Sequence, residues 1–227
     1  MTSPELARVA RRARMHLKRV DPVMARVMDA VGPFRPANRA GGTHLNALLR
    51  AIVFQQLSGK AATTIFNRLL DLFPDREPTA KGILAKSDAE LRAAGLSRQK
   101  IGYLRDLSTK VAAGALPLDH VDTLNDTDLI AHLVQVKGIG RWTAQMFLMF
   151  KLGRVDVLPH LDLGIQNAIK RHYRRRKVGP KDVLRIGARW TPYSSIACWY
   201  LWRSLDNGGG QLDAAKKKPA KRKPTAR

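Results

Sequence analysis

The sequence has almost no cysteine and no long apolar run. Cys198 is the only cysteine among 227 residues, which excludes disulfides within the chain, zinc knuckles and four-cysteine iron–sulfur clusters. No apolar stretch approaches the roughly 18 residues that a bilayer-spanning helix needs. The first twenty residues interleave arginine with short apolar steps, so they lack the continuous core of a signal peptide. We therefore expect a soluble intracellular protein.

Acidic residues are also scarce. The chain has 18 Asp and Glu against 41 Lys and Arg, which gives a formal charge of +23 and a pI of about 11.1. Because 44% of its residues are hydrophobic, it can bury a core, and this excludes a wholly disordered basic protein. Its length fits one domain, or two small lobes around one cleft.

The positive charge is spread over three regions. Residues 207–227 hold three consecutive glycines and seven Lys and Arg, which predicts a disordered basic tail. Without residues 212–227 the chain still carries about +17. Further clusters lie in the first predicted helix and at Lys170–Lys177 (KRHYRRRK). An excess of this size indicates a polyanionic partner, for which nucleic acid is favoured over a ribosomal or a membrane-surface partner.

Hydrophobic periodicity predicts an all-α protein. Apolar residues recur at helical spacing in 45–53 and 101–111, and no alternating strand run of convincing length occurs. Glycine and proline divide the chain into roughly ten short helices. Internal repeats are absent from the sequence.

Signatures of nucleotide hydrolysis and metal catalysis are missing. Ser58-Gly59-Lys60 is not a phosphate-binding P-loop, because Phe54 stands where the first glycine is required. The six histidines show no metal-ligand spacing. The sequence therefore predicts no catalytic metal.

Residues 126–150 predict two helices joined by a glycine turn. Residues 126–136 (DTDLIAHLVQV) have one apolar face and acids in the first turn. Lys137-Gly138-Ile139-Gly140 follows, and residues 141–150 (RWTAQMFLMF) form the second apolar helix. The glycines permit positive φ and close approach of another backbone, and the first amides of the second helix can hold a phosphate without reading bases. By itself, such a turn can equally be an ordinary helix–helix connection.

The string VKGIGRWTA resembles the helix-hairpin-helix of the DNA glycosylase superfamily, in which an aspartate follows some twenty residues later. Asp162 lies twenty positions after Trp142. The likeness extends over most of residues 17–206. The stretches that look like its alkylated-base branch, 3-methyladenine DNA glycosylase II, are Asp21-Pro22, AIVFQQLSGKAA (51–62), LSRQKIGYLRDLS (96–108) and ARWTPYSSIACWYLW (188–202).

The resemblance implies a two-lobed helical glycosylase fold over residues 1–206, with the hairpin at about 126–150. It also implies that the turn binds the DNA backbone; the residues concerned are Lys137, Gly138, Ile139, Gly140 and Thr143. No cofactor is implied, apart from a structural monovalent cation that the hairpin carbonyls hold in relatives.

Asp162 is the predicted catalytic residue. Cleavage of an N-glycosidic bond builds positive charge on the sugar, and a nearby carboxylate stabilises it. The same carboxylate can also orient or deprotonate the attacking water, and the sequence does not separate the two roles. A lone aspartate before a helix is otherwise most often an N-cap.

An alkylated purine is cationic, and aromatic faces attract cations. Trp142 and Trp202 match pocket tryptophans of the resembling family, although either can equally be a core residue. Met146 stands where some relatives place a tyrosine, which indicates a less polarising pocket wall and a different selectivity.

Two further predictions follow from the resemblance. Bifunctional relatives carry a lysine where this chain has Trp142, so we expect no lyase activity. Gln56 best matches the residue that fills the gap left by the extruded base, with Leu57 as the alternative. Gln55 and Gln56 can also merely cap the preceding helix.

We thus expect a monofunctional DNA glycosylase that removes 3-methyladenine and 7-methylguanine from duplex DNA and starts base excision repair. The alternatives are a non-catalytic helix-hairpin-helix DNA-binding protein and a glycosylase for deaminated or oxidised bases. We expect a monomer with damaged double-stranded DNA as its partner, cytoplasmic and nucleoid-associated, or nuclear in a eukaryote.

Overall fold

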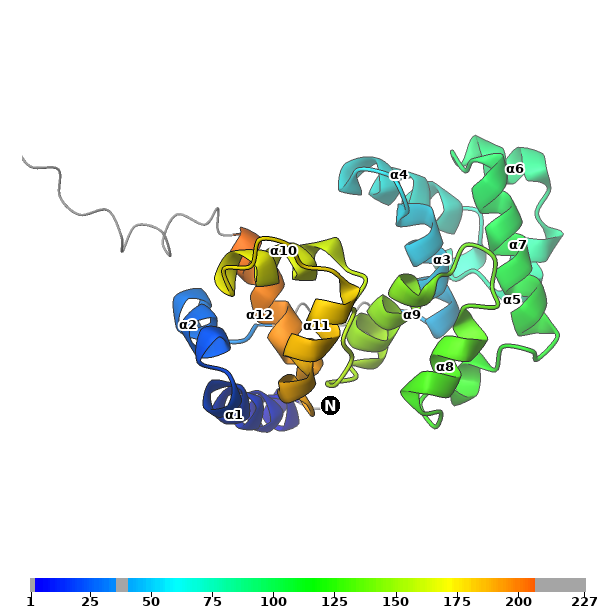
Figure 1. Cartoon of the computed structure of the whole chain (residues 1–227). Coiled ribbons are helices and arrows are strands. Elements are labelled where there is room, and N and C mark those ends of the chain that lie inside the picture. Colours follow the sequence, from blue (N-terminus) through cyan, green and yellow to red (C-terminus); the bar gives the residue numbers. More distant parts are fainter. Residues whose placement is uncertain (1–2, 36–40, 207–227) are drawn as a thin grey trace, which may run out of the picture. The chain divides into compact units, whose positions relative to one another are not determined.

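The computed structural model describes residues 3–35 and 41–206. The predicted basic tail, residues 207–227, lies outside this range. Within the described ranges the regular structure is entirely helical (Figure 1). Contacts divide the chain into two compact units: unit 1 comprises Met1–Pro36 and His160–Arg227, and unit 2 comprises Ala37–Pro159.

Unit 1 joins the beginning of the chain to its end. Its α-helices are α1 (Ser3–Val20), α2 (Pro22–Val31), α10 (Leu163–His172), α11 (Pro180–Gly187) and α12 (Ser194–Asp206). The central element is α12, which packs against α1, α2 and α10 and buries Cys198, Tyr200 and Leu201. The core of unit 1 therefore forms around the last helix that the structure describes.

Asp21 joins several elements of unit 1. Its Oδ1 caps α2 by accepting hydrogen bonds from the amides of Val23 and Met24, at 3.0 and 3.1 Å. Its Oδ2 accepts from Tyr173 Oη at 2.5 Å and Trp190 Nε1 at 2.9 Å. Burial and the adjacent carboxylate raise the pKa of Tyr173. Asp21, only 1% exposed, therefore has a structural role.

Unit 2 contains the hairpin. Its α-helices are α3 (His44–Phe54), α4 (Gly59–Leu70), α5 (Ala80–Ala85), α6 (Asp88–Ala93), α7 (Arg98–Ala112), α8 (Asp126–Leu133) and α9 (Arg141–Phe147). Helix α7 packs against α3, α5 and α6, and α3 also packs against α4 and α9. Five of these helices begin after a Ser or Thr whose side chain accepts an amide hydrogen of the first turn; the caps are Thr43, Ser58, Thr79, Ser87 and Ser97.

The two hairpin helices differ from the sequence prediction at their ends. The first was expected to reach Val136, but α8 ends at Leu133, because the amides of Gln135 and Val136 bond only three residues back and tighten the last turn. The second was expected to remain α-helical to Phe150. Instead α9 ends at Phe147 and continues as a π-helical turn, Leu148–Leu152.

None of the helices in the described ranges combines the length and the apolarity that crossing a membrane requires.

Candidate functional site

The turn between α8 and α9 is built so that its backbone can be approached closely. Gly138 has a φ of +85°, and a Cβ there would lie 2.2 Å from Tyr103 Cδ2, so only glycine fits. Ile139 is 3% exposed and anchors the turn in the core. Gly140 caps α9 with a φ of −88°, and a Cβ at this residue would meet nothing within 4 Å. The turn thus presents an open backbone surface at Gly140.

Two amides of the turn are used within unit 2. Lys137 N donates to Asp106 Oδ2 at 2.8 Å, and Ile139 N donates to Val136 O at 3.0 Å. The first backbone hydrogen bond of α9 runs from Ala144 N to Gly140 O. The amides of residues 141–143 come before this donor, in the first turn of the helix. Of the predicted backbone-binding residues, Lys137 keeps an exposed side chain, whereas Thr143 is 8% exposed.

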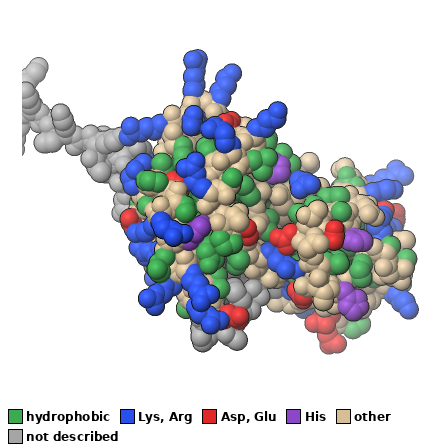
Figure 2. All heavy atoms as spheres, turned by 60° about the horizontal axis from the view of Figure 1, so that its bottom comes forward, with side chains coloured by type: hydrophobic (Ala, Val, Ile, Leu, Met, Phe, Trp, Pro, Cys, Tyr) green, Lys and Arg blue, Asp and Glu red, His purple; other side chains and the backbone are tan. Residues whose placement is uncertain are grey.

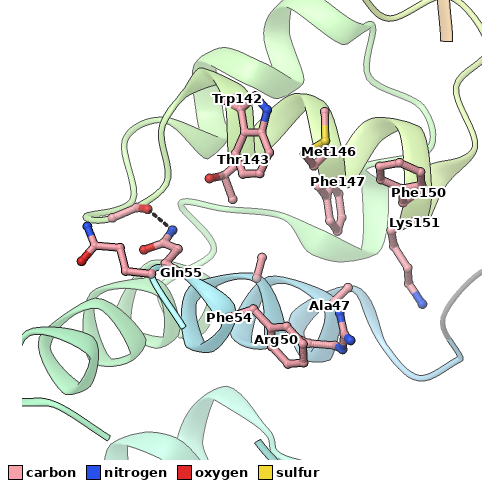
Figure 3. Close-up of a pocket in the computed structure, with 13 residues that line it drawn as sticks. Ala47, Arg50, Phe54, Gln55, Trp142, Thr143, Met146, Phe147, Phe150 and Lys151 are labelled. Carbon is pink, nitrogen blue, oxygen red and sulfur yellow. Dashed lines mark hydrogen bonds between the residues drawn. The ribbon is translucent and has the colours of Figure 1, made fainter. Parts of the chain in front are cut away.

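The loop between α3 and α4 meets the hairpin turn. Gln55 is the C-cap of α3, and its side-chain Nε2 donates to Gly138 O at 2.8 Å (Figure 3). Gln56 has a φ of +57° and is exposed, and Leu57 is 39% exposed. Of the two glutamines considered as caps of the preceding helix, Gln55 is the one that caps α3. Gln56 and Leu57, the two predicted wedge residues, are exposed at the surface of unit 2.

A cavity of about 900 Å³ lies within unit 2, lined mainly by α3 and by α9 with its π-helical continuation (Figure 3). Trp142 and Met146, two of the three predicted base-pocket residues, line this cavity, whereas the third, Trp202, belongs to unit 1. Trp142 is 44% exposed, which excludes the alternative that it is a core residue. Gln56, Gly138 and Thr143 border the same cavity.

Sequence reasoning missed several residues of this cavity. Its wall also contains the aromatic rings of Phe54, Phe147 and Phe150. The guanidinium of Arg50 stacks on Phe54, with Cζ 3.8 Å from the ring centroid. Phe150 follows Trp142 and Met146 at intervals of four, so helical spacing could have placed it on their face. Phe54 and Arg50 lie on another helix, and no local pattern links them to Trp142.

Asp162 lies in unit 1 and is the N-cap of α10. Its Oδ1 accepts hydrogen bonds from Ile165 N at 2.8 Å and Trp202 Nε1 at 2.9 Å. Asp162 as a whole residue is 9% exposed. A Cβ on Gly164 would lie 3.0 Å from both Asp162 Oδ1 and Trp202 Cδ1. Asp162 is therefore held in one orientation beside an indole, and the N-cap geometry weighed in the sequence analysis is present.

The predicted site residues thus form two groups, one in each unit. Asp162 and Trp202 are in direct contact in unit 1. Trp142, Met146 and the hairpin and loop residues gather around one cavity in unit 2.

Metal ligands do not cluster in the described part of the chain, where His, Cys, Asp and Glu form no group of three or more that could hold an ion. Two carbonyls of the hairpin, those of Val136 and Gly138, already accept a hydrogen bond. Each carbonyl oxygen has a second lone pair that can accept a further contact. A monovalent cation at the turn stays a prediction.

Comparison with known proteins gives the family. Residues 49–192 match the HhH-GPD superfamily of base excision DNA repair proteins. The chain belongs to this superfamily. The resemblance and the all-helical fold expected from the sequence are thereby confirmed.

Several relatives cover most of the chain. DNA-3-methyladenine glycosylase 1 of Schizosaccharomyces pombe is 36% identical over 198 residues, which are 85% of this chain and 86% of the relative. A structure of the S. pombe 3-methyladenine DNA glycosylase Mag1 in complex with abasic DNA has a TM-score of 0.77 at 35% identity and covers 86% of this chain and 97% of that one. A DNA-3-methyladenine glycosidase from Bacillus halodurans has a TM-score of 0.78 at 33% identity, covering 86% and 90%.

Proposed function

We propose that this member of the superfamily is a monofunctional DNA glycosylase that excises alkylated purines, 3-methyladenine and 7-methylguanine, from duplex DNA. The observation that carries the substrate class is the 36% identity, over 85% of the chain, to a relative named DNA-3-methyladenine glycosylase 1. The reaction hydrolyses the N-glycosidic bond and leaves the free base and an abasic site.

Asp162 is the catalytic carboxylate in this proposal. Positive charge develops on the deoxyribose as the base departs, and a fixed carboxylate in a water-poor site stabilises that charge without having to reorganise. The hydrogen bonds from Ile165 N and Trp202 Nε1 supply the fixed orientation. The same carboxylate orients the water that attacks the anomeric carbon.

The cavity of unit 2 supports selection of a cationic base. Trp142 offers a half-exposed indole, and Phe54 and Phe150 extend the aromatic wall. A cationic base over such an aromatic face gains about 0.5–2 kcal/mol of binding free energy from the cation–π interaction. Arg50 stacks on one face of Phe54 and brings a permanent positive charge to the wall, so Trp142 is the face that we assign to the alkylated base.

Absence of lyase activity belongs to the same proposal. A lyase needs an amine nucleophile at the sugar, and Trp142 stands where bifunctional relatives carry lysine. Lys151 also lines the cavity, but its ammonium donates a hydrogen bond to Gly42 O. Borohydride treatment during the reaction should therefore trap no covalent protein–DNA adduct, and the product strand should break only after alkali. A trapped adduct would contradict this assignment.

Backbone binding is assigned to the open turn around Gly140. The turn grips phosphates on one strand while Gln56 or Leu57 occupies the space left by the extruded nucleotide. The protein acts as a monomer on damaged duplex DNA, which sedimentation of the complex with a short lesion-bearing duplex can check.

The function is tested by incubating the protein with randomly methylated duplex DNA and identifying the bases that appear in solution. We expect 3-methyladenine and 7-methylguanine. Tight duplex binding without any free base would indicate a non-catalytic DNA-binding protein. Release from duplexes with deaminated or oxidised bases, but not from methylated DNA, would indicate a glycosylase for those lesions.

A further inference from the structure

We propose that α7 is a positioning helix, in which Lys100, Tyr103 and Asp106 hold the α3–α4 loop and the hairpin turn at a fixed separation. These three residues are called the α7 clamp below. The inference rests on the proposed function: the loop carries the wedge and the turn grips the backbone. If both must engage DNA together, the helix that connects them governs base extrusion without touching DNA.

The first end of the clamp holds the loop. Lys100 Nζ donates to Val53 O at 2.5 Å and to Gln55 O at 2.9 Å, the carbonyls at the C-terminus of α3. A cation at a helix C-terminus pairs with carbonyls that lack intrahelical donors. Partial burial of the ammonium in this contact lowers its pKa.

The residue that follows this contact is the predicted wedge. Gln56 has a φ of +57°, a conformation that residues other than glycine adopt only when their surroundings hold them there. Lys100 fixes the carbonyl of Gln55, directly before this residue. The orientation of Gln56 therefore depends on Lys100.

The second end of the clamp holds the hairpin turn. The Tyr103 ring lies against Gly138 so closely that a Cβ there would be 2.2 Å from Cδ2. Asp106 Oδ2 accepts from Lys137 N and from Lys110 Nζ, both at 2.8 Å. Burial works against the charge of Asp106, yet these donors hold its pKa below the usual value. The turn is therefore fixed on both sides of the Lys137–Gly138 peptide.

The loop and the turn also contact each other. Gln55 Nε2 donates to Gly138 O at 2.8 Å, which closes a ring of contacts from α7 to the loop, to the turn and back to α7. The clamp residues follow one another at intervals of three, so they share one face of the helix. Two DNA-contacting segments far apart in sequence are thus held by one rigid element, which preorganises them.

The test measures base extrusion separately from cleavage. The probe is a duplex with a 2-aminopurine next to a methylated purine, whose fluorescence rises when the neighbouring base leaves the stack. Lys100→Met should slow the fluorescence rise and single-turnover base release together, by about tenfold or more, because a small displacement of a positioned group is costly. Affinity for a duplex with an abasic site, where no base needs extrusion, should change far less.

Three variants give the comparison its controls. Lys100→Arg keeps a cation that can reach the same carbonyls and should restore most of the extrusion rate. Lys81→Met removes an exposed lysine of α5 in the same unit and should behave as wild type. Gln55→Leu removes the donor of the loop–turn hydrogen bond, so combining it with Lys100→Met should cost less than the product of the two single effects.

Folding of each variant is checked by circular dichroism and thermal melting. If Lys100→Met does not fold, Gln55→Leu and Asp106→Ala, which removes the acceptor of the Lys137 amide, carry the test, and extrusion at the wild-type rate in both would overturn the proposal. If Lys100→Met folds and extrudes the base at the wild-type rate, the clamp is equally overturned.

The proposed function has a separate readout in the same assay. Asp162→Asn should extrude the base at the wild-type rate and release it about 10²–10³-fold more slowly. A wild-type protein that releases no base from the probe would overturn the proposed function, whereas a wild-type protein that releases it while Lys100→Met does so equally fast overturns only the clamp.

Discussion

At the scale of single residues, Gly138 and Gly140 stand two positions apart in one turn and differ in what they tolerate. Gly138 combines a left-handed backbone with direct contact to the Tyr103 ring, whereas Gly140 has an ordinary φ and open space around its Cα. The first glycine is required for the fold of the turn. The second is required only if another molecule approaches there.

Gly138→Ala should destabilise the protein by about 2 kcal/mol or more, because it combines a strained φ with a steric clash in a packed region. Urea denaturation followed by circular dichroism measures this. Gly140→Ala is the matched control: its stability should stay within about 0.5 kcal/mol of wild type, while its affinity for duplex DNA falls. Equal stability of the two variants would contradict the geometry of the turn.

At the scale of elements, the N-terminus of α6 carries a reciprocal cap. Ser87 Oγ accepts from Glu90 N, and Glu90 accepts from Ser87 N at 2.8 Å. The Ser87 amide, with Lys86 and the Ser87 hydroxyl, lowers the pKa of Glu90 from 4.5 to about 2. The ionised carboxylate is therefore the form that supports this helix.

Glu90→Gln should lower the melting temperature at neutral pH. A carboxyl with a depressed pKa stabilises the fold above its unfolded-state pKa and loses that contribution as pH falls through its folded-state pKa. The difference between wild type and variant should therefore be full above pH 4.5 and shrink towards pH 2. Thermal melts across this range measure it, and a difference that grows on acidification would contradict the assignment.

Asp21, at the junction of α1 and α2, accepts hydrogen bonds from Tyr173 and Trp190. Asp21→Ala should cost about 3 kcal/mol, because it removes a helix cap and leaves buried donors without an acceptor. Asp29→Ala is a control from the same region: its carboxylate is exposed and pairs with Arg14 and Lys18, so the stability should barely change. Comparable losses in chemical denaturation would contradict the structural role of Asp21.

The hairpin could be predicted from the sequence, because a glycine turn between two amphipathic helices is determined by residues that are close together in the chain. It did not predict the α7 clamp, since Lys100 and Gln55 are 45 residues apart and Gln55 and Gly138 are 83 apart. The contact between Asp162 and Trp202 spans 40 residues, and the resemblance supplied both residues without their hydrogen bond. Tertiary contacts of this kind have no local signature.

At the scale of the whole molecule, Lys and Arg outnumber Asp and Glu in both units as well as in residues 207–227. Figure 2 shows Lys and Arg side chains over much of one face, with Asp and Glu fewer among them. Unit 1 has the larger excess, since it contains the arginines of α1 and the 170–177 cluster. Nonspecific attraction to DNA should therefore involve the folded body as well as the tail outside the described residues.

The affinity for undamaged duplex should fall steeply with salt. If the folded body neutralises about five phosphates, log affinity plotted against log salt has a slope near −4.5. Removing residues 212–227 should weaken this binding while leaving base release largely intact. Fluorescence anisotropy at several salt concentrations gives the slope, and loss of the chemical step on truncation would contradict a tail that acts only as a tether.

The catalytic role of the Asp162 carboxylate is tested most directly by single-turnover release of 3-methyladenine by wild type and Asp162→Asn. Asparagine caps helices as well as aspartate does and can still accept the bond from Trp202, so the variant should fold and bind abasic duplex normally. Its base release should fall by about 10²–10³-fold. Release at the wild-type rate would contradict a catalytic role of Asp162.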